Sequence, residues 1–240
     1  MIDMHSHILP QIDDGAVNID ESIKMLKEAY KAGFTDIVST SHYIVNEYCT
    51  TKEERKKLIQ ILEERLKLEN IKINIYNGAE AYINTNLSDL ISEGTLPTIN
   101  GTKYLLVELP MNNKIICLNE IINELKNNDI IPIIAHPERY SYVQRDPNIL
   151  DELIKQGVIF QANYGSIIGK YGNEAKKTVK KLLKNNVIQL LGTDTHRSGS
   201  MYTQMEKSIK KITKLVGKDR FEILSDINPL NVIENKEIIR

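Results

Sequence analysis

The chain begins with the stretch MIDMHSH, residues 1–7, in which an aspartate and two histidines occupy every second position. Successive side chains of a β-strand point to opposite faces, so a strand here would place Asp3, His5 and His7 on one side. Neutral imidazole binds zinc, iron, nickel and manganese, and two imidazoles beside a carboxylate form half of a metal site. The alternative is a polar strand whose histidines only form hydrogen bonds with their neighbours.

The remaining histidines favour the metal-site interpretation. The chain has five histidines, and the other three are His42, His136 and His196. Each of these three ends an apolar run of sequence that is typical of a β-strand. Histidines that all stand at strand ends are difficult to explain as independent hydrogen-bonding residues, so the sequence predicts one shared site.

Short strand-like runs alternate with amphipathic helical stretches along the chain. Thr51 and Glu54 fit a capping box at the start of one helix, and Asp146 with Pro147 fits the start of another. The pattern predicts seven strands, which end at His7 and then span residues 35–42, 72–76, 104–108, 130–136, 158–163 and 187–194. It predicts helices over residues 19–32, 51–68, 115–127 and 146–156, around 175–183 and 205–216, and a mostly helical tail over residues 217–240.

Seven strands with helices between them imply a parallel sheet, either a closed βα barrel or an open doubly wound sheet. The carboxylates Glu80, Glu108 and Asp194 lie at or just after the C-terminal ends of three predicted strands. Catalytic residues of a βα barrel come from many strand ends, whereas an open sheet concentrates its site at one point and usually carries a glycine-rich phosphate turn. The chain has no such turn, so the sequence predicts a single α/β domain over residues 1–240, a TIM-like barrel of seven strands.

Nine side chains are candidate metal ligands. Metal sites that keep a position open for water use about three or four protein ligands per ion, so nine groups suit two or three divalent ions if one carboxylate bridges. The lack of thiolates among them favours manganese, iron or zinc and argues against an iron–sulfur cluster. Taken singly, Asp14 or Glu108 could instead be a helix cap or a loop carboxylate. The nine are His5, His7, Asp14, His42, Glu80, Glu108, His136, Asp194 and His196.

Charge and composition exclude several classes of function. The 31 Lys and Arg residues nearly balance the 32 Asp and Glu residues, and the two signs are interspersed, so no nucleic acid and no anionic membrane is expected as a partner. No apolar run approaches the length of a transmembrane helix, and no signal peptide is expected because candidate ligands begin at residue 3. The two cysteines are too few for a disulfide framework, and we expect a cytoplasmic protein.

A phosphatase with a cysteine nucleophile is a competing hypothesis, because Cys49 and Arg55 fit the spacing Cys-x5-Arg. Such an enzyme needs a small, glycine-rich loop whose backbone donors surround the phosphate. The intervening residues, TTKEE (50–54), include two anionic side chains and no glycine, and they also fit the start of a helix. We therefore interpret the match as chance.

Seven short motifs carry a family resemblance: DMHSH (3–7), DDG (13–15), SH (41–42), GAE (78–80), VELP (107–110), AHPER (135–139) and GTDTH (192–196). Together they resemble the polymerase and histidinol phosphatase (PHP) family, and more closely its CpsB/YwqE-type protein-tyrosine phosphatases from bacterial capsular and exopolysaccharide operons. The resemblance extends from residue 1 to about residue 200. It implies a distorted seven-stranded βα barrel with a trinuclear, manganese-preferring site. The implied substrate is the phosphotyrosine-bearing tail of a cognate bacterial tyrosine kinase that controls polysaccharide synthesis.

The resemblance also implies roles for individual residues. Asp3 would orient a ligating histidine, and Arg139 would bind phosphate through its planar fork of donors, although an exposed salt bridge is the alternative for any arginine. These phosphatases carry another arginine several residues beyond the last Asp-x-His, where this chain has SGSM (198–201), and Arg197 could take its place. The implied ligand sets are His5, His7, Glu80 and Asp194 for a first metal, Glu80, Glu108 and His136 for a second, and Asp14, His42 and His196 for a third.

Clustered divalent cations would bind the phosphoryl oxygens and supply a metal-bound hydroxide, so we expect direct attack without a phosphoenzyme. Tyrosines in predicted loops could stack on the substrate ring; they are Tyr43, Tyr48, Tyr140, Tyr142 and Tyr164. The nearest alternative function is a small-molecule phosphatase of the same superfamily, such as a histidinol phosphate phosphatase. A nuclease, an amidohydrolase and an inactive metal-bound partner of the kinase are further alternatives, and the sequence leaves an oligomer open.

Overall fold

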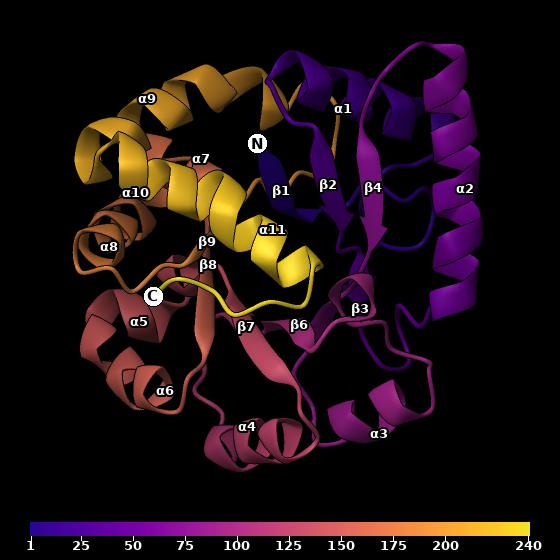
Figure 1. Cartoon of the computed structure of the whole chain (residues 1–240). Coiled ribbons are helices and arrows are strands. Elements are labelled where there is room, and N and C mark those ends of the chain that lie inside the picture. The colour runs from indigo at the N-terminus through magenta and orange to yellow at the C-terminus, as the bar shows by residue number, and fades with distance from the viewer.

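Nine parallel strands form two curled sheets at the centre of the computed structural model, which describes residues 1–240 (Figure 1). The smaller sheet has the order β1-β2-β4, and the larger sheet has the order β3-β5-β6-β7-β8-β9. All neighbouring strands run parallel, so the chain returns between them through helices and long loops. The strands are β1 (Ile2–Ser6), β2 (Asp36–Ser39), β3 (His42–Tyr43), β4 (Asn74–Asn77), β5 (Glu80–Tyr82), β6 (Tyr104–Glu108), β7 (Ile131–Ala135), β8 (Ile159–Asn163) and β9 (Leu190–Gly192).

Helices surround the sheets (Figure 1). The capping box at the start of α2 is confirmed, because Glu54 N donates to Thr51 Oγ1 at 3.3 Å and Thr51 N donates to Glu54 Oε2 at 2.9 Å. The α-helices are α1 (Ile19–Lys31), α2 (Lys52–Leu68), α3 (Leu87–Ser92), α4 (Leu118–Asn127), α5 (Ser141–Arg145), α6 (Asp151–Lys155), α7 (Tyr164–Ile168), α8 (Gly172–Lys184), α9 (Met205–Val216), α10 (Lys218–Glu222) and α11 (Asn228–Ile233). The shorter helices are η1 (Ile99–Gly101), η2 (Pro137–Arg139), η3 (Pro147–Leu150), η4 (Tyr202–Gln204) and the π-helical turn η5 (Ile223–Ile227).

The predicted count of seven strands is not confirmed. The strand predicted over residues 35–42 is divided into β2 and β3, and β5 is an additional strand that follows the one predicted over residues 72–76. The breaks separate β2 from β3 at residues 40–41 and β4 from β5 at residues 78–79. The guanidinium of Arg55, on α2, donates to the backbone oxygens of Ser41, His42 and Gly78 at 2.7–3.1 Å. These hydrogen bonds satisfy carbonyl groups that a continuous strand would have paired with its neighbour.

The first and last strands lie side by side (Figure 1). Ser6 and Thr195 form a parallel bridge, Asp194 N donates to His5 O at 2.8 Å, and His7 N donates to Thr195 O at 3.0 Å. His5 near the end of β1 and His7 just after the strand therefore lie next to the segment that contains Asp194 and His196.

Two apolar clusters form the core. The larger packs the helices against the outside of the sheets. The smaller lies between the sheets and includes Leu106, Ile133 and Ile159, and Val232 and Ile233 of α11 complete it. Side chains of a strand alternate between its faces, so the inward positions that follow toward the C-terminal ends of β6 and β8 are residues 108, 161 and 163, all polar. The fold thus places an apolar plug at one end of the enclosed space and a polar cluster at the other.

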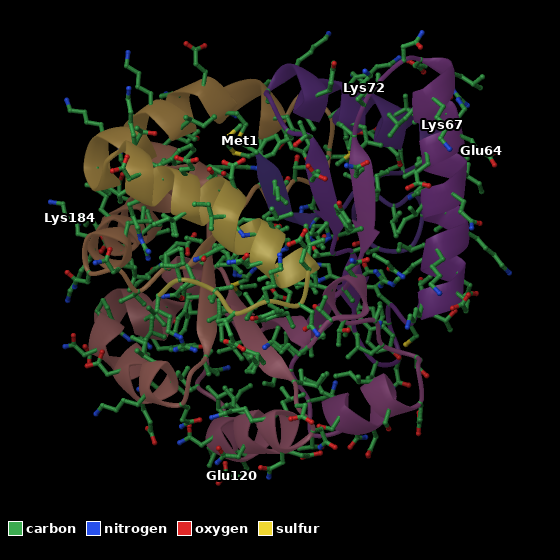
Figure 2. The ribbon with its side chains drawn as sticks, viewed as in Figure 1. Met1, Glu64, Lys67, Lys72, Glu120 and Lys184 are labelled. Atoms are coloured by element: carbon green, nitrogen blue, oxygen red, sulfur yellow. The ribbon has the colours of Figure 1, made fainter.

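Charged side chains occupy the periphery of the molecule. Figure 2 shows Glu64, Lys67 and Lys184 projecting outward from the ribbon, as expected for solvated charges. None of the helices combines the length and the apolar composition that crossing a membrane requires.

Candidate metal centre

The structure brings all nine predicted ligands together beyond the C-terminal ends of the strands. They form four overlapping groups, and within each group the candidate ligand atoms lie within 4.8 Å of one another. The groups are His7, Asp14, His42 and His196; His5, His7 and Glu80; His5, His136 and Asp194; and His42, Glu80 and Glu108. These groups differ from the ligand sets that the family resemblance implies. His7 joins Asp14, His42 and His196, and His136 lies with His5 and Asp194.

Glu80 is the centre of this cluster. Its Oε2 lies 3.2 Å from His5 Nε2, 3.4 Å from His7 Nε2 and 3.1 Å from His42 Nδ1. Its Oε1 lies 3.0 Å from His136 Nε2. Burial raises the pKa of Glu80, but the imidazoles of His5, His136 and His7 outweigh burial and hold the pKa well below its usual value. A carboxylate that faces four imidazoles can bridge two ions.

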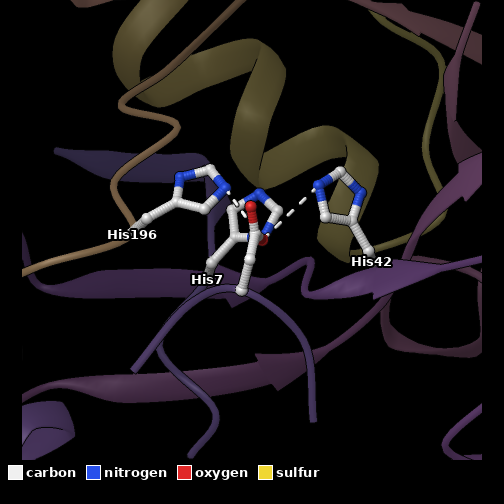
Figure 3. Close-up of side chains that lie close together, drawn as sticks. His7, His42 and His196 are labelled. Atoms are coloured by element: carbon white, nitrogen blue, oxygen red, sulfur yellow. Dashed lines mark ion pairs between the residues drawn. The ribbon is translucent and has the colours of Figure 1, made fainter. Parts of the chain in front are cut away.

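Asp14 forms the accessible edge of the cluster. Its Oδ1 lies 3.3 Å from His196 Nε2 and 3.7 Å from His42 Nε2, the two ion pairs dashed in Figure 3. The rings of His196 and His42 lie on either side of His7 in this view. The side chain of Asp14 is 55% exposed and that of His196 29% exposed, whereas those of His5 and His7 are fully buried. The cluster therefore has a closed floor and a rim that a solute can reach.

Hydrogen bonds orient the two N-terminal histidines. His7 Nδ1 donates to Asp13 Oδ2 at 2.8 Å, and Asp13 Oδ2 also accepts from His42 N at 2.8 Å. His5 Nδ1 donates to Gln161 Oε1 at 2.8 Å. Both bonds leave Nε2 free to bind a metal. These two hydrogen-bond partners were not predicted from the sequence, although Asp13 stands in the DDG motif and Gln161 interrupts an apolar strand.

Asp3 does not share a face with the two histidines, so that prediction is wrong. The register between β1 and β2 shifts between Asp3 and Ser6, which breaks the alternation of the strand. Asp3 Oδ2 accepts from Thr193 Oγ1 at 2.6 Å and from Tyr202 Oη at 2.8 Å, and its Oδ1 accepts from His5 N at 3.2 Å. Burial raises the pKa of this carboxyl group. Asp3 thus contacts the backbone of His5 rather than its imidazole.

Two of the candidate ligands adopt left-handed backbone conformations. The φ angle is 34° at His136 and 51° at Asp194. Such angles are uncommon for residues other than glycine and often mark functional sites.

Arg139 lies at the edge of the cluster. Its Nη1 donates to Asp194 Oδ2 at 2.6 Å, and its guanidinium carbon lies 4.5 Å from the centre of the Tyr171 ring. The side chain is 25% exposed. Burial lowers the pKa of Arg139, but Asp194, Tyr171, Glu80 and Glu138 together outweigh burial and raise the pKa. The structure therefore holds a fixed positive charge beside the candidate ligands.

Arg197 has different surroundings. Its Nη1 donates to the backbone oxygens of Asp14 at 2.7 Å, His196 at 2.9 Å, and Gly15. The guanidinium thus fixes the loop that carries Asp14. The predicted phosphate contact of Arg197 stays a prediction.

The structure contradicts the cysteine-nucleophile hypothesis. Arg55 is fully buried and its guanidinium donates to backbone oxygens, as described above. Cys49 is exposed and its Sγ lies 3.4 Å from Ile44 O. The two side chains therefore enclose no phosphate pocket, and the match to Cys-x5-Arg is chance.

The predicted stacking tyrosines are mostly inaccessible. Tyr43, Tyr140, Tyr142 and Tyr164 are buried. Tyr48 remains half-buried, and its ring stacks on that of His42 with the centres 6.2 Å apart and 15° between the planes. Of the five, Tyr48 is the one placed to meet a substrate ring.

The donor set fits divalent cations. The Nε2 atoms of His5 and His7 lie 3.2 Å apart, and both face the carboxylates of Glu80 and Asp194. Burial lowers the pKa of His5, but Glu80 and Asp194 outweigh it and raise the pKa to about 9. Burial and the charge of Glu80 raise the pKa of Glu108 to about 8. Buried imidazoles and carboxylates without thiolates suit manganese, iron or zinc.

The fold and this cluster define the class: an α/β protein built around histidine and carboxylate groups that could hold metal ions. Residues 1–234 match the family described as capsular polysaccharide synthesis, CpsB/CapC. The chain belongs to that family, which confirms the resemblance drawn from the motifs.

One relative and two solved structures add detail to this family assignment. It is 28% identical over 240 residues to the tyrosine-protein phosphatase YwqE of Bacillus subtilis, covering all of this chain and 94% of the relative. A structure described as YwqE of B. subtilis and CpsB of Streptococcus pneumoniae, metal-dependent tyrosine phosphatases, superposes with a TM-score of 0.94 and 28% identity, covering 100% of this chain and 97% of the other. Histidinol phosphate phosphatase of Lactococcus lactis shares the fold, with a TM-score of 0.60 at 17% identity over 89% of this chain and 93% of the other.

Proposed function

We propose that this chain is a metal-dependent protein-tyrosine phosphatase. Its substrate would be the phosphotyrosine-bearing tail of a cognate bacterial tyrosine kinase that regulates capsular or exopolysaccharide synthesis. The overlap of four groups of candidate ligands around Glu80, with Arg139 at their edge, carries the proposal. Membership of the CpsB/CapC family and the similarity to tyrosine phosphatases support it.

The cofactor in this proposal is two or three divalent ions, of which Mn²⁺ is the first choice and iron or zinc the alternatives. Bound ions would supply Lewis acidity for the phosphoryl oxygens and lower the pKa of a water nucleophile toward about 7. The buried groups around Glu80 would hold the inner ions, and the accessible group that includes Asp14 and His196 would hold the outer one. Asp13 and Gln161 would keep the Nε2 atoms of His7 and His5 directed into the cluster.

The protein itself would bind and orient the phosphate ester. Arg139 keeps its Nη2 and Nε groups available beside the Nη1 that contacts Asp194, so it can donate to phosphoryl oxygens. The rim at Asp14 and His196 gives access, and Tyr48 beside His42 offers a ring for the phenyl group. We expect direct attack of water on phosphorus and release of tyrosine.

We also propose an overall architecture for the chain. The hydrogen bonds that join His5 and His7 to the backbone of Asp194 and Thr195 support one distorted barrel of seven strand positions, in which β2 and β3 share one position and β4 and β5 another. Residues 1–240 would form this single domain, with residues 217–240 as a helical tail. We place the protein in the cytoplasm, without nucleic acid as a partner.

Release of phosphate from three substrates tests the function. A phosphotyrosine peptide, histidinol phosphate and DNA are each incubated with the protein, with and without added Mn²⁺. We expect hydrolysis of the peptide, dependent on the metal. Preference for histidinol phosphate or DNA would replace the proposal with one of the alternative functions.

A variant at the second metal position tests the site. His136→Ala removes one ligand outside the apolar core, so turnover should fall by orders of magnitude while circular dichroism stays unchanged. Cys49→Ser is the matched control and should retain wild-type turnover. Near-wild-type activity of His136→Ala at limiting Mn²⁺ would remove this histidine from the site.

A further inference from the structure

Strand β8 supplies none of the nine candidate ligands, yet it ends in two buried amide side chains. Gln161 is fully buried and Asn163 is 1% exposed. They follow Ile159, which packs in the apolar cluster between the sheets, at successive inward positions of the strand. Burial of an amide without hydrogen-bond partners is strongly destabilising, so these two residues require an explanation.

The two amides link a histidine to a carboxylate through consecutive hydrogen bonds. His5 Nδ1 lies 2.8 Å from Gln161 Oε1. Gln161 Nε2 donates to Asn163 Oδ1 at 2.9 Å, and Asn163 Nδ2 donates to Asp194 Oδ2 at 2.7 Å. This amide chain, as we name the path from His5 through Gln161 and Asn163 to Asp194, joins two residues of the metal cluster.

Chemistry fixes the direction of the amide chain. An ionised carboxylate only accepts hydrogen bonds, so Asn163 must present its NH₂ group to Asp194. Its oxygen then faces Gln161, which must donate to it and must present its own oxygen to His5. An amide oxygen only accepts, so the proton of the imidazole sits on Nδ1 and leaves the lone pair of Nε2 for a metal.

As a result of the same contacts, the two carboxylate oxygens of Asp194 have different partners. Oδ2 accepts from Asn163 at 2.7 Å and from Arg139 at 2.6 Å. Oδ1 lies 3.6 Å from His5 Nε2 and 3.5 Å from His7 Nε2. Only Oδ1 therefore faces the histidines.

A glycine on the adjacent strand makes room for this arrangement. Gly192 of β9 pairs with Asn163 of β8. A Cβ atom at position 192 would lie 2.4 Å from His5 Cβ and 2.8 Å from Gln161 Nε2, distances that real Cβ atoms do not show. The close approach of the imidazole and the amide thus depends on a residue without a side chain.

We propose that Gln161 and Asn163 are positioning residues that set the metal affinity of the cluster. They hold His5 in the tautomer with a free Nε2 and turn one oxygen of Asp194 toward the metals. This inference rests on the proposed metal-dependent function. Partners of metal ligands typically contribute about 10–100-fold to metal affinity, and that is the effect we expect here.

Binding of Co²⁺ and Mn²⁺ to the metal-free protein tests the inference without using activity. Gln161→Met keeps the length of the side chain and removes both hydrogen bonds. Gln161→Glu keeps an acceptor for His5 but cannot donate to Asn163. The control is Gln189→Met, because Gln189 is also largely buried and bonds to Phe160 N at 3.0 Å, outside the cluster.

Titration calorimetry should show an affinity about 10–100-fold weaker in Gln161→Met, a smaller loss in Gln161→Glu, and no loss in Gln189→Met. The visible absorption of bound Co²⁺ should change in Gln161→Met, because the geometry of one ligand changes. Wild-type affinity and spectrum in Gln161→Met would overturn the inference. An equal loss in all three variants together with equal thermal destabilisation would also overturn it, since the role would then be structural. Failure of the wild-type protein to bind either metal would instead overturn the proposed function.

Discussion

Arg55 offers a sharp test of how the fold supports the metal cluster. Its guanidinium is fully buried and contacts no carboxylate. It donates to four backbone oxygens, those of Ser41 at 2.9 Å, His42 at 2.7 Å, Gly78 at 3.1 Å and Thr50 at 3.1 Å. Burial lowers the pKa of Arg55 to about 10, so the group still carries its charge at neutral pH. The perturbation is Arg55→Met, which keeps the apolar stem and removes the donors.

Two opposing effects set the size of the change. Hydrogen bonds to a charged donor contribute about 1.5–3 kcal/mol each, so four bonds contribute roughly 6–12 kcal/mol. Desolvation of the guanidinium costs several kcal/mol, which Arg55→Met recovers. The carbonyl groups, however, stay in place without a donor, and each unsatisfied buried group costs about 1–3 kcal/mol. We therefore expect a net loss of about 3–5 kcal/mol in the free energy of unfolding.

Urea and thermal unfolding in the presence of EDTA measure this loss independently of metal binding. For a chain of this length about 1 kcal/mol corresponds to 2–4 °C, so Tm should fall by roughly 10 °C. Arg65→Met is the matched control, because Arg65 lies on the same helix, is 44% exposed, and pairs with the exposed Asp20. The control should change stability by less than about 0.5 kcal/mol. A loss below about 1 kcal/mol in Arg55→Met would refute the argument that its donors hold the strand breaks together.

Three further predictions concern the chemistry of the site. EDTA should abolish turnover and iodoacetamide should not, because Cys49 is exposed and has no phosphate pocket; inhibition by the alkylating reagent alone would contradict a metal mechanism. Arg139→Lys should lower kcat/KM by about 10²–10³-fold with unchanged metal content, since lysine cannot donate two parallel bonds to phosphate, and an unchanged kcat/KM would assign phosphate binding to the metals alone. Metal affinity should rise with pH between 6 and 9. The raised pKa values of His5 (about 9) and Glu108 (about 8) mean that both hold protons at pH 7, which a metal must displace. Calorimetry in buffers of different ionisation enthalpy should detect the released protons, and a pH-independent affinity would contradict the assignment.

Much of the fold and the clustering of the candidate ligands were predictable from the sequence. Parallel strands place their C-terminal ends at one edge, so the histidines that end separate apolar runs had to meet. The capping box at Thr51 and Glu54 is a local pattern, and local patterns do not depend on distant contacts. Both kinds of signal are contained within about ten residues of sequence.

Other features depend on contacts between residues far apart in the chain, which the local sequence pattern does not indicate. The strand breaks follow from the hydrogen bonds of Arg55, a residue of α2. In the sequence, Arg55 stood out only because its spacing from Cys49 matches that of a cysteine phosphatase. The register shift that separates Asp3 from His5 depends on pairing with β2. A glutamine in an apolar strand such as Gln161 does indicate a buried amide that needs hydrogen-bond partners. The local sequence did not identify its partner, His5, which lies 156 residues away.

The charges of the cluster explain why its metal-free form holds protons. Asp14, Glu80, Glu108 and Asp194 bring four carboxyl groups together, and Arg139 is the one arginine that contacts them through its side chain. With all four ionised, the repulsion would be severe in a largely buried space. The raised pKa values of His5 and Glu108 indicate that protons on these two groups reduce this repulsion in the metal-free protein. Two divalent ions would neutralise the four carboxylates, and a third would leave, with Arg139, an excess of positive charge. A phosphate dianion and a hydroxide at the rim would carry negative charge that this excess positive charge attracts. Carboxylates that repel one another would therefore, once neutralised by bound cations, form part of a site that attracts an anionic substrate.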